Sequence, residues 1–471
     1  MAELIGREEE LAEMERRFMN PNIRTMAIWG RRRVGKTALI QQFVRDKRHI
    51  MLTAIEHSLK GSLESFDESI DAFNDTKGDK RSEKFTDILK RLVPIGKHSE
   101  RTVIVIDEYT YLCEEDPDTN SHLQVFIDRD LQDMNAMLII CGSSIKMMEN
   151  IFTDGKGALY RRFIGPMKIL PLTYEKCRPF HPNMDEADRM RVYALIGGIP
   201  LYHLMMNDGT VEECVKNNFL GTYAPLRDEA DFIIARELDP VSTNLGILRA
   251  ISDGHVTRKE IAGVTGMSEE NVTVNLKKME TIGVVSPLNP MCGANRKERI
   301  YRITDNLVRL SNEVLTPFAT AVSGQDREYG YDTILPYLQT FYGPAFEDIC
   351  VQYVRRHRRC KELGSWWGRS GGESTDIDIV ALCEDDGTEY HLICECKFRN
   401  KESGIREIRE LENTAGSLKN CHNMRFCMFS RSGFTDELIE YAESRGIELL
   451  TPETMAENDR KQNVPDIRIS G

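Results

Sequence analysis

Residues 26–40 read Met-Ala-Ile-Trp-Gly-Arg-Arg-Arg-Val-Gly-Lys-Thr-Ala-Leu-Ile: an apolar run, a glycine-bracketed turn and the start of an apolar helix. The turn has the spacing G-x-x-x-x-G-K-T of a phosphate-binding loop. Backbone N–H groups of such a loop, with the amino end of the following helix, surround phosphate oxygens. A chance match in an ordinary strand-to-helix turn is the alternative. The residues expected to bind ATP are Gly30, Arg31, Arg32, Arg33, Val34, Gly35, Lys36, Thr37 and Ala38.

Side chains beside this turn complete a predicted magnesium and hydrolysis site. Lys36 is expected to neutralise the outer phosphates, and Thr37 to place its hydroxyl on Mg²⁺. A second apolar run, residues 102–106, ends in Asp107 and Glu108, as a buried parallel strand ends at a ligand-binding edge. We expect Asp107 to hold Mg²⁺ and Glu108 to polarise the attacking water. The pair of motifs predicts an ATPase, whereas a strand ending in Asp-Glu alone would be weak support.

Two further polar positions are candidates for sensing the nucleotide. The apolar run 136–141 ends in Gly-Ser-Ser, and Ser143 is the candidate sensor of the γ-phosphate; a helix cap is the alternative for a serine at a strand end. Arg161 and Arg162 follow. One of them is a candidate arginine finger for a neighbouring subunit in a homo-oligomer, and a solvated or salt-bridged pair is the alternative.

The composition is typical of a globular protein whose surface is not dominated by basic residues. Of the 471 residues, 41% are hydrophobic and 29% charged, which fits about three domains. No apolar run approaches the ~18 residues of a membrane span, and the amino terminus has no apolar signal region, so we expect a cytoplasmic protein without a membrane partner. The formal charge of −13 means that DNA binding must rest on a local groove. Twelve cysteines without a C-x-x-C pair predict reduced, buried thiols and neither a zinc site nor a disulfide framework.

Five segments between residues 1 and 240 resemble the AAA+-related prokaryotic ATPases often called archaeal ATPases, within the wider STAND-like group. These segments are Ile5-Gly6-Arg7-Glu8 with Glu10-Leu11, Gly30 to Thr37, Ile106-Asp107-Glu108, Gly142-Ser143-Ser144 and Gly197-Gly198-Ile199-Pro200-Leu201-Tyr202. The resemblance implies that Gly6 and Arg7 lie near the adenine and that Pro200 opens a helix that senses the nucleotide. Members of the family usually have a glycine before the paired arginines, a position where this chain has Leu159-Tyr160.

The segment 241–321 has the pattern of a winged helix. Thr257 and Glu260 form a capping box that opens a helix. Ser268 opens the next helix, expected over residues 269–280. Strand-like residues 284–285 and a return at 299–303 follow, which completes the order of helices and strands in a winged helix.

The charges of this segment support two interpretations. The helix 269–280 would enter the major groove of DNA, and basic residues of the wing would touch phosphates; these are Arg296, Lys297 and Arg299. However, Glu269 and Glu270 at the start of that helix would repel a phosphate backbone. A packing or interdomain role is therefore the alternative.

Two strands near the carboxyl terminus carry a second chemical pattern. The alternation over residues 376–397 predicts a hairpin that turns at residues 384–387. Because side chains of a strand repeat every two residues, Asp378 shares a face with Asp376, and Glu395 shares one with Lys397. We expect Asp378 and Glu395 to bind Mg²⁺ and Lys397 to orient or deprotonate water, chemistry that suits phosphodiester cleavage.

This pattern resembles the PD-(D/E)xK nuclease superfamily, in the version called DUF234 that follows such ATPases, over residues 335 to 455. Glu347, on a helix-like stretch, is expected to complete the site. The basic run 355–361 and the pair Trp366–Trp367 are candidate contacts for nucleic acid, with a solvated helix face and core packing as alternatives. Every residue needed for cleavage is present. A domain can keep this fold without the activity, so a degraded domain with a purely binding or structural role is the alternative.

The predicted fold class is α/β with several domains. These are a P-loop ATPase domain with a parallel sheet at 1–175, an all-helical lid at 176–240, a winged helix domain at 241–321, a linker at 322–334 and a nuclease-like α/β domain at 335–471. The expected function is ATP binding and hydrolysis with Mg²⁺, in which the nucleotide state controls the winged helix and a metal-dependent domain that acts on DNA. The alternatives are a nucleotide-gated DNA-binding regulator and a signalling scaffold with an inactive nuclease fold.

Overall fold

The chain divides into two compact units. The computed structural model describes residues 4–76, 78, 81–206, 209–293, 299–370 and 373–462. The first unit contains residues 1–172 and 199–201, and the second contains residues 173–198 and 202–471. In the described ranges, no helix is both long and apolar enough to cross a lipid bilayer.

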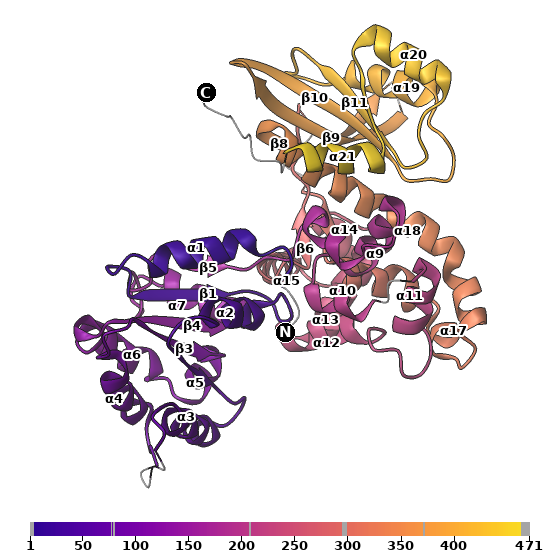
Figure 1. The fold of residues 1–471 in the computed structure, drawn as a ribbon. Helices are drawn as coiled ribbons and strands as arrows, with labels where there is room; N and C mark the ends of the chain where they lie inside the picture. The colour runs from indigo at the N-terminus through magenta and orange to yellow at the C-terminus, as the bar shows by residue number, and fades with distance from the viewer. Residues whose placement is uncertain are drawn as a thin grey trace. The chain divides into compact units, whose positions relative to one another are not determined.

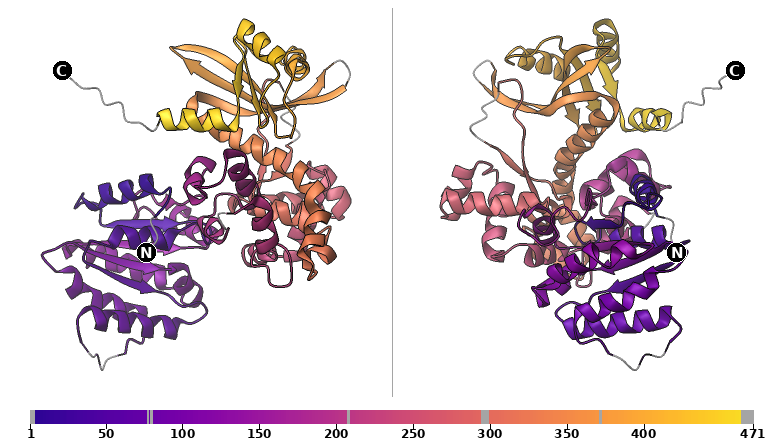
Figure 2. Two further views of the ribbon diagram at one scale, coloured as in Figure 1. Left: turned by 45° about the vertical axis from the view of Figure 1, so that its right-hand side comes forward. Right: turned by 90° about the vertical axis from the view of Figure 1, so that its left-hand side faces the viewer.

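The first unit is a five-stranded parallel sheet flanked by helices (Figures 1 and 2). The strands, in the spatial order β2-β3-β4-β1-β5, are β1 (Thr25–Trp29), β2 (His49–Thr53), β3 (Thr102–Asp107), β4 (Ala136–Gly142) and β5 (Met167–Lys168). Its helices are α1 (Glu8–Phe18), α2 (Lys36–Val44), α3 (Leu59–Phe73), α4 (Phe85–Gly96), α5 (Tyr109–Glu115), α6 (Thr119–Asp128), the 3₁₀ turn η1 (Leu131–Asp133) and α7 (Ile145–Thr153). Every residue of β1, β3 and β4 is buried, as expected of strands covered on both faces.

The strand order of this sheet positions the predicted ATPase residues. β4 pairs in parallel with both β1 and β3. Because the carboxyl ends of parallel strands meet at one edge, the turns that follow Trp29, Asp107 and Gly142 lie together. The three strands predicted from apolar runs therefore supply one common site.

The second unit begins with helices. These are α8 (Tyr174–Cys177), the 3₁₀ turn η2 (Arg178–Phe180), α9 (Glu186–Ile196), α10 (Pro200–Met205, whose first two residues belong to the first unit), α11 (Val211–Asn218), α12 (Glu229–Glu237), α13 (Val241–Ser252), α14 (Arg258–Thr265), α15 (Glu269–Thr281), α16 (Asn306–Leu310), the π-helical turn η3 (Ser311–Leu315) and α17 (Ala319–Ser323). A short antiparallel pair, β6 (Val285–Pro287) and β7 (Tyr301–Ile303), follows α15. The capping box of Thr257 and Glu260 is present at the start of α14.

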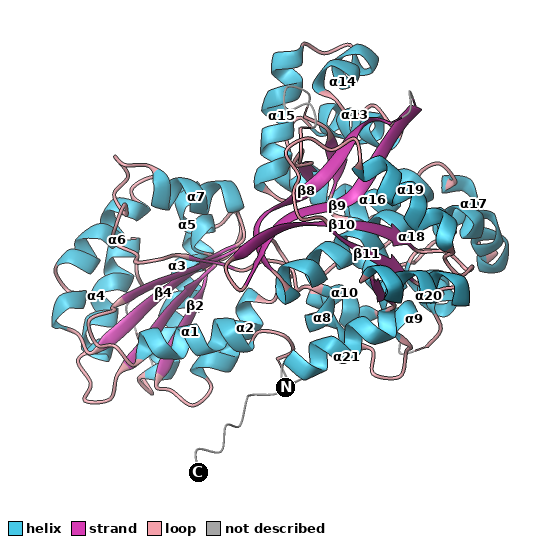
Figure 3. Cartoon of the chain, turned by 90° about the horizontal axis from the view of Figure 1, so that it is seen from above, coloured by secondary structure: helices cyan, strands magenta, loops and turns pink. Residues whose placement is uncertain are grey.

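The carboxyl-terminal part of the second unit is a mixed sheet in the order β12-β11-β10-β9-β8. Its elements are α18 (Arg327–His357), β8 (Arg359–Ser370), β9 (Glu373–Asp385), β10 (Thr388–Lys397), α19 (Ile405–Ala415), β11 (Arg425–Ser430), α20 (Asp436–Arg445), β12 (Glu448–Leu450) and α21 (Pro452–Gln462). β8, β9 and β10 are antiparallel, whereas β10, β11 and β12 are parallel. Helix α18 lies on one face, and α19 and α20 lie on the other (Figures 1 and 2). Figure 3 shows the long strands of this sheet from above. The chain as a whole is therefore α/β, as the sequence predicted.

The structure differs from the sequence-based expectation at the segment predicted as a linker. Residues 327–334 of that segment form the first turns of α18, whose N-cap Asp326 accepts a hydrogen bond from the N–H of Tyr329. Polar residues here serve as a cap and an exposed helix face, which a composition-based reading cannot distinguish from a connection.

The cysteines also differ from expectation. Cys292 and Cys421 form a disulfide with a Cα–Cα distance of 6.1 Å, so the prediction that all thiols are reduced is wrong for this pair. The two residues are 129 positions apart in the sequence. A spacing of that length carries no signal, because only the fold brings the two segments together.

Candidate functional site

The phosphate-binding loop joins β1 to α2, and its two glycines are required by the backbone. A Cβ at Gly30 would lie 2.3 Å from the carbonyl oxygen of Ile169, just beyond β5. Gly35 is the N-cap of α2 and has a φ of +92°, in the left-handed region that favours glycine. Lys36 is buried, and its Nζ donates to the carbonyl oxygens of Gly30, at 2.9 Å, and of Arg31, at 3.0 Å. The ammonium is thus held within the loop.

Residues from the start of α2 and from the ends of β3 and β4 meet beside this loop. The hydroxyl of Thr37 donates to Oδ2 of Asp107 at 3.2 Å. The carboxylate of Glu108 accepts hydrogen bonds from the hydroxyl of Ser143 and from its backbone N–H, the latter at 3.2 Å. A hydroxyl and a carboxylate in contact are ligands that Mg²⁺ prefers, so the side chains present fit a magnesium–triphosphate complex.

The backbone at Glu108 is held in an unusual conformation. Its φ of +53° and ψ of +40° are left-handed, which is uncommon for a residue with a side chain. The N–H of Glu108 donates to Oδ1 of Asp107 at 3.1 Å. Such conformations cluster at functional sites because the surrounding structure must hold them in place. Here the hydrogen bonds to Ser143 and Asp107 keep Glu108 in this conformation.

Arg7 packs under the phosphate-binding loop. Its side chain is 3% exposed, and Nη2 donates to the carbonyl oxygens of Val34, at 2.8 Å, and of Leu170, at 2.7 Å. Gly6 precedes it with a φ of +71°. Pro200 lies on the other side of the loop, where a Cβ at Gly35 would be 3.9 Å from its Cγ. Gly6, Arg7 and Pro200 are therefore next to the loop, and the guanidinium of Arg7 is committed to backbone carbonyls.

Several other arginines of this unit have partners within the chain. Arg32 donates to the hydroxyl of Tyr111. Arg33 has a left-handed φ of +67°. Arg162 forms an ion pair of 2.7 Å with Asp128, which lowers the pKa of that carboxyl. Arg161 has its guanidinium 5.3 Å from the ring centroid of Tyr160. Of the two candidate fingers, Arg162 is thus engaged in a salt bridge.

These features together define a P-loop NTPase domain: a glycine-bracketed loop between a central parallel strand and a helix, with Lys36 and Thr37 at the start of α2 and Asp107 at the end of β3. Comparison with known families narrows this class. Residues 4–206 match the family described as an ATPase domain predominantly from Archaea, and residues 313–408 match DUF234, described as archaeal and bacterial proteins of unknown function. The amino-terminal part of the chain is thus similar to archaeal-type ATPase domains, and a later segment is similar to DUF234 proteins.

Individual proteins resemble the chain over most of its length. The uncharacterised protein MJECL04 of Methanocaldococcus jannaschii is 27% identical over 414 residues, which cover 86% of this chain and 90% of that protein. The Walker-type ATPase PABY2304 of Pyrococcus abyssi matches 66% of this chain and 96% of its own, with 17% identity and a TM-score of 0.49. The ORC2 protein of Aeropyrum pernix matches 68% and 96%, with 14% identity and a TM-score of 0.43.

The predicted nuclease residues lie on neighbouring elements of the second unit. In the β9–β10 pairing, Cys394 opposes Ile379, so Glu395 follows opposite Asp378. Oδ2 of Asp378 accepts a hydrogen bond of 2.7 Å from the N–H of Cys396, and Nζ of Lys397 forms an ion pair with Glu395. The two strands therefore bring the aspartate, the glutamate and the lysine together, as their alternation predicted.

Burial and mutual repulsion perturb these carboxyls. Burial, then Glu395 and Glu347, raise the pKa of Asp378 well above its usual range. Burial raises the pKa of Glu347, on α18, to about 7. Burial disfavours the charged form of Lys397, but Glu395 raises the pKa of that lysine overall. Oxygen ligands of Asp378, Glu395 and Glu347 do not all lie within 4.8 Å of one another, so a bound cation would have to draw them closer.

Three cationic side chains of the basic run 355–361 form ion pairs inside the chain. Arg356 pairs with Asp459, Arg358 with Glu448 at 2.6 Å, and Lys361 with Glu389 at 2.7 Å. Arg355 and Arg359 of the same run are exposed, so part of its positive charge lies at the surface. Trp366 is 5% exposed and packs in the core of the mixed sheet, as the alternative interpretation expected. Arg296 and Lys297 of the predicted wing lie outside the described residues, and Arg299 is exposed.

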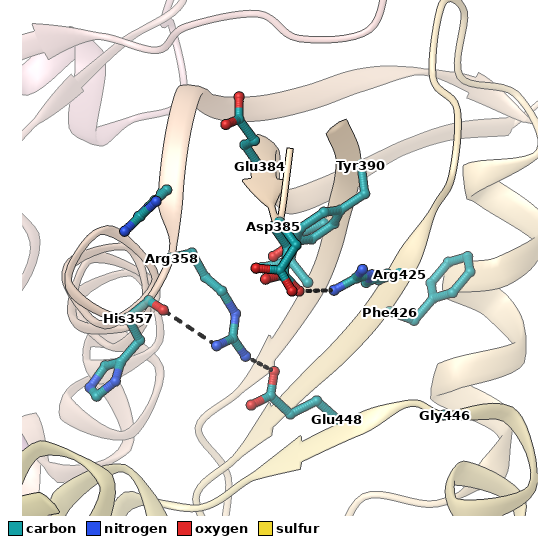
Figure 4. Close-up of a pocket in the computed structure, with 12 residues that line it drawn as sticks. His357, Arg358, Glu384, Asp385, Tyr390, Arg425, Phe426, Gly446 and Glu448 are labelled. Carbon is teal, nitrogen blue, oxygen red and sulfur yellow. Dashed lines mark hydrogen bonds and ion pairs between the residues drawn. The ribbon is translucent and has the colours of Figure 1, made fainter. Parts of the chain in front are cut away.

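A hollow of about 510 Å³ opens at the far end of the β9–β10 hairpin (Figure 4). Figure 4 shows Arg358 pointing to Glu448 and Arg425 pointing to Asp385, the latter pair at 3.2 Å. Asp385 ends β9, seven residues from Asp378, or about 23 Å along an extended strand. The hollow is therefore separate from the carboxylate–lysine cluster, and the guanidinium groups of Arg358 and Arg425 in its lining are already paired.

Proposed function

We propose that the protein hydrolyses ATP with Mg²⁺ at the loop between β1 and α2. The observation that carries this proposal is the contact of 3.2 Å between Thr37 and Asp107, next to the buried ammonium of Lys36. This arrangement gathers a hydroxyl, a carboxylate and a fixed cation beside backbone N–H groups that point into the loop. The family matched by residues 4–206 supports the same activity.

Each residue would have a defined task. ATP with its Mg²⁺ supplies a polarised γ-phosphoryl group when bound. Lys36 would leave the carbonyls of Gly30 and Arg31 to contact phosphate oxygens, and Thr37 and Asp107 would hold the metal. Glu108 would accept a proton from the attacking water, and Ser143 would orient that carboxylate. Release of Glu108 from Ser143 is the rearrangement by which the site would respond to its nucleotide.

Two substitutions test this assignment separately. Lys36→Ala should abolish tight ATP binding, because the fixed positive charge of the loop is lost. Glu108→Gln should keep ATP binding but lose turnover, because an amide cannot accept the proton. Lys60→Ala is the matched control, since the Lys60 side chain is 87% exposed on α3. ATP binding by calorimetry and phosphate release are the measurements; equal turnover in all three variants and the wild type would refute the proposal.

A second candidate function belongs to the DUF234 segment. We propose that Asp378, Glu395 and Glu347 bind a divalent cation and that Lys397 orients water for cleavage of DNA. The supporting observation is the placement of the aspartate, the glutamate and the lysine on paired strands, with a half-buried third carboxyl on α18. The α13–α15 helices with the β6–β7 pair would form a winged helix that contacts DNA or transmits the nucleotide state.

The test compares wild type with Lys397→Ala on duplex and single-stranded DNA in Mg²⁺ or Mn²⁺. Lys401→Ala is the control, because Lys401 is an exposed lysine nearby. Cleavage that requires Lys397 supports the nuclease. Absence of cleavage under both metals, or cleavage that survives Lys397→Ala, rejects it. In that case, ATP-dependent DNA binding without cleavage would favour a DNA-binding regulator, and no DNA binding would favour a signalling scaffold.

A further inference from the structure

Three potential metal ligands meet at a place that neither proposed activity uses. Among the described residues, Cys292, His391 and Cys421 each offer one ligand atom, and these atoms all lie within 4.8 Å of one another. Cys292 lies between β6 and β7, His391 lies in β10, and Cys421 lies in the segment before β11. All three belong to the second unit.

The backbone fixes Cys292 at this place independently of any cross-link. The N–H of Met291 donates to the carbonyl of Ser365 at 3.0 Å, and the N–H of Ser365 donates to the carbonyl of Asn289 at 3.0 Å, so residues 289–291 run along β8. The N–H of Lys419 donates to the carbonyl of Cys292 at 2.9 Å. Met291 is 6% exposed and packs in the same core as Trp366. The site is therefore built by the fold.

His391 has the surroundings of a ligand imidazole. Its side chain is buried, at 5% exposure, and Nδ1 lies 3.2 Å from the carbonyl oxygen of His422 and 3.3 Å from the backbone nitrogen of the same residue. A metal-binding histidine usually donates its second ring N–H to a carbonyl or carboxylate, which fixes the tautomer and the ring orientation. In the tautomer that carries its proton on Nδ1, the ring donates to the carbonyl of His422, and the lone pair of Nε2 is left for a metal.

We propose that the reduced protein binds Zn²⁺ through Cys292, Cys421 and His391, with a solvent molecule in the fourth position. Two thiolates and an imidazole are a donor set typical of zinc, whereas Mg²⁺ and Ca²⁺ prefer oxygen ligands. Zinc binding and the Cys292–Cys421 disulfide exclude each other, because both use the same sulfur atoms.

The change between the two states is a balanced exchange. A dithiol reductant gives two electrons and two protons to the disulfide and becomes a disulfide itself, which leaves two thiols on the protein. Each thiol then loses its proton when its sulfur binds Zn²⁺. In either state, residues between β6 and β7 stay tied to the segment before β11, so the metal would replace the covalent link when thiols are reduced.

The experiment uses the full chain, reduced with a dithiol, freed of metal with a chelator and kept without oxygen. Zn²⁺ is added, and the bound metal is measured after gel filtration. The wild type should retain about one Zn²⁺ per chain. Cys292→Ser and Cys421→Ser should lose most of it. Cys360→Ser is the matched control, because Cys360 also lies near a second sulfur, that of Cys383 at 3.2 Å, and should bind zinc as the wild type does.

A second measurement does not depend on variants that might misfold. Zn²⁺ should slow alkylation of Cys292 and Cys421 in the reduced wild type, as read by mass spectrometry of peptides, while Cys360 reacts at an unchanged rate. Co²⁺ in place of Zn²⁺ should give thiolate-to-metal charge-transfer absorption. A reduced wild type that retains no zinc and shows no protection of the two cysteines would overturn the proposal, as would equal loss of zinc in Cys360→Ser.

Discussion

The buried guanidinium of Arg7 offers a test of how the phosphate-binding loop is supported. Arg7 stands directly before α1, and its Nη2 donates to the carbonyls of Val34 and Leu170. Its Nη1 forms an ion pair of 2.8 Å with Glu10. Replacement by alanine removes the donor for two backbone carbonyls, one of them within the loop itself.

The expected cost follows from these lost contacts. A buried polar group left without a partner costs about 1–3 kcal/mol. Arg7→Ala leaves two such carbonyls, partly rehydrated by water that enters the vacated space. The free energy of unfolding should therefore fall by about 3 kcal/mol. A unit of this size loses about 2–4 °C of Tm per kcal/mol, so its melting temperature should fall by about 6–12 °C. Arg7→Lys should lose less, because one donor is retained.

The assay measures thermal melting in the absence of nucleotide and the binding of ATP and of inorganic tripolyphosphate. Arg16→Ala is the matched control on the same helix: Arg16 also makes two hydrogen bonds, to Glu13, but its side chain is 68% exposed, so the change should leave the Tm nearly unchanged. A loosened loop should weaken the binding of ATP and the binding of tripolyphosphate by the same factor. An unchanged Tm, or loss of affinity for ATP alone, would refute this support role and favour a contact with adenine.

Three further changes have expected outcomes. Ser143→Ala removes the hydroxyl that donates to Glu108 and should lower kcat roughly 10- to 100-fold with little change in ATP affinity, as measured by phosphate release and calorimetry. Gly364→Ala would place a Cβ 2.1 Å from the carbonyl oxygen of Asn289 and should destabilise the second unit by about 1–3 kcal/mol in a denaturant titration. Burial, then His181, lower the pKa of His203 to about 3. Because the unfolded chain takes up this proton below about pH 6.5 and the folded chain does not, stability should fall by about 1.4 kcal/mol per pH unit as the pH drops below 6.5, and His203→Gln should remove this slope.

The first two of these changes have a control variant that the chain itself supplies. Ser144→Ala alters a neighbouring hydroxyl that makes no capping hydrogen bond, and it should leave kcat unchanged. Gly246→Ala introduces a Cβ with no atom within 4 Å and should not destabilise. Comparable effects in the control and the test variant would contradict the first two predictions. A pH slope that persists in His203→Gln would contradict the third.

Several elements could be read directly from local sequence patterns. The apolar runs 102–106 and 136–141 correspond to β3 and β4, and the helix expected over 269–280 is α15, Glu269–Thr281. These succeed because buried parallel strands and capped helices are determined by residues close together in the chain. The prediction of a linker did not anticipate the start of α18, because polar residues at an exposed helix start have the same composition as polar residues of a connecting loop.

The sequence by itself determined the chemistry available at the phosphate-binding loop. The spacing of Gly30, Gly35, Lys36 and Thr37 identifies the loop, because a phosphate cradle depends on the backbone of one short segment. Only the tertiary structure decided how distant residues serve that loop or lie apart from it. It placed Ser143 against Glu108 and put Arg7 beneath Val34. It also brought Cys292 to Cys421 across 129 residues, because contacts between remote segments arise from the packing of sheets and helices and leave no trace in local spacing.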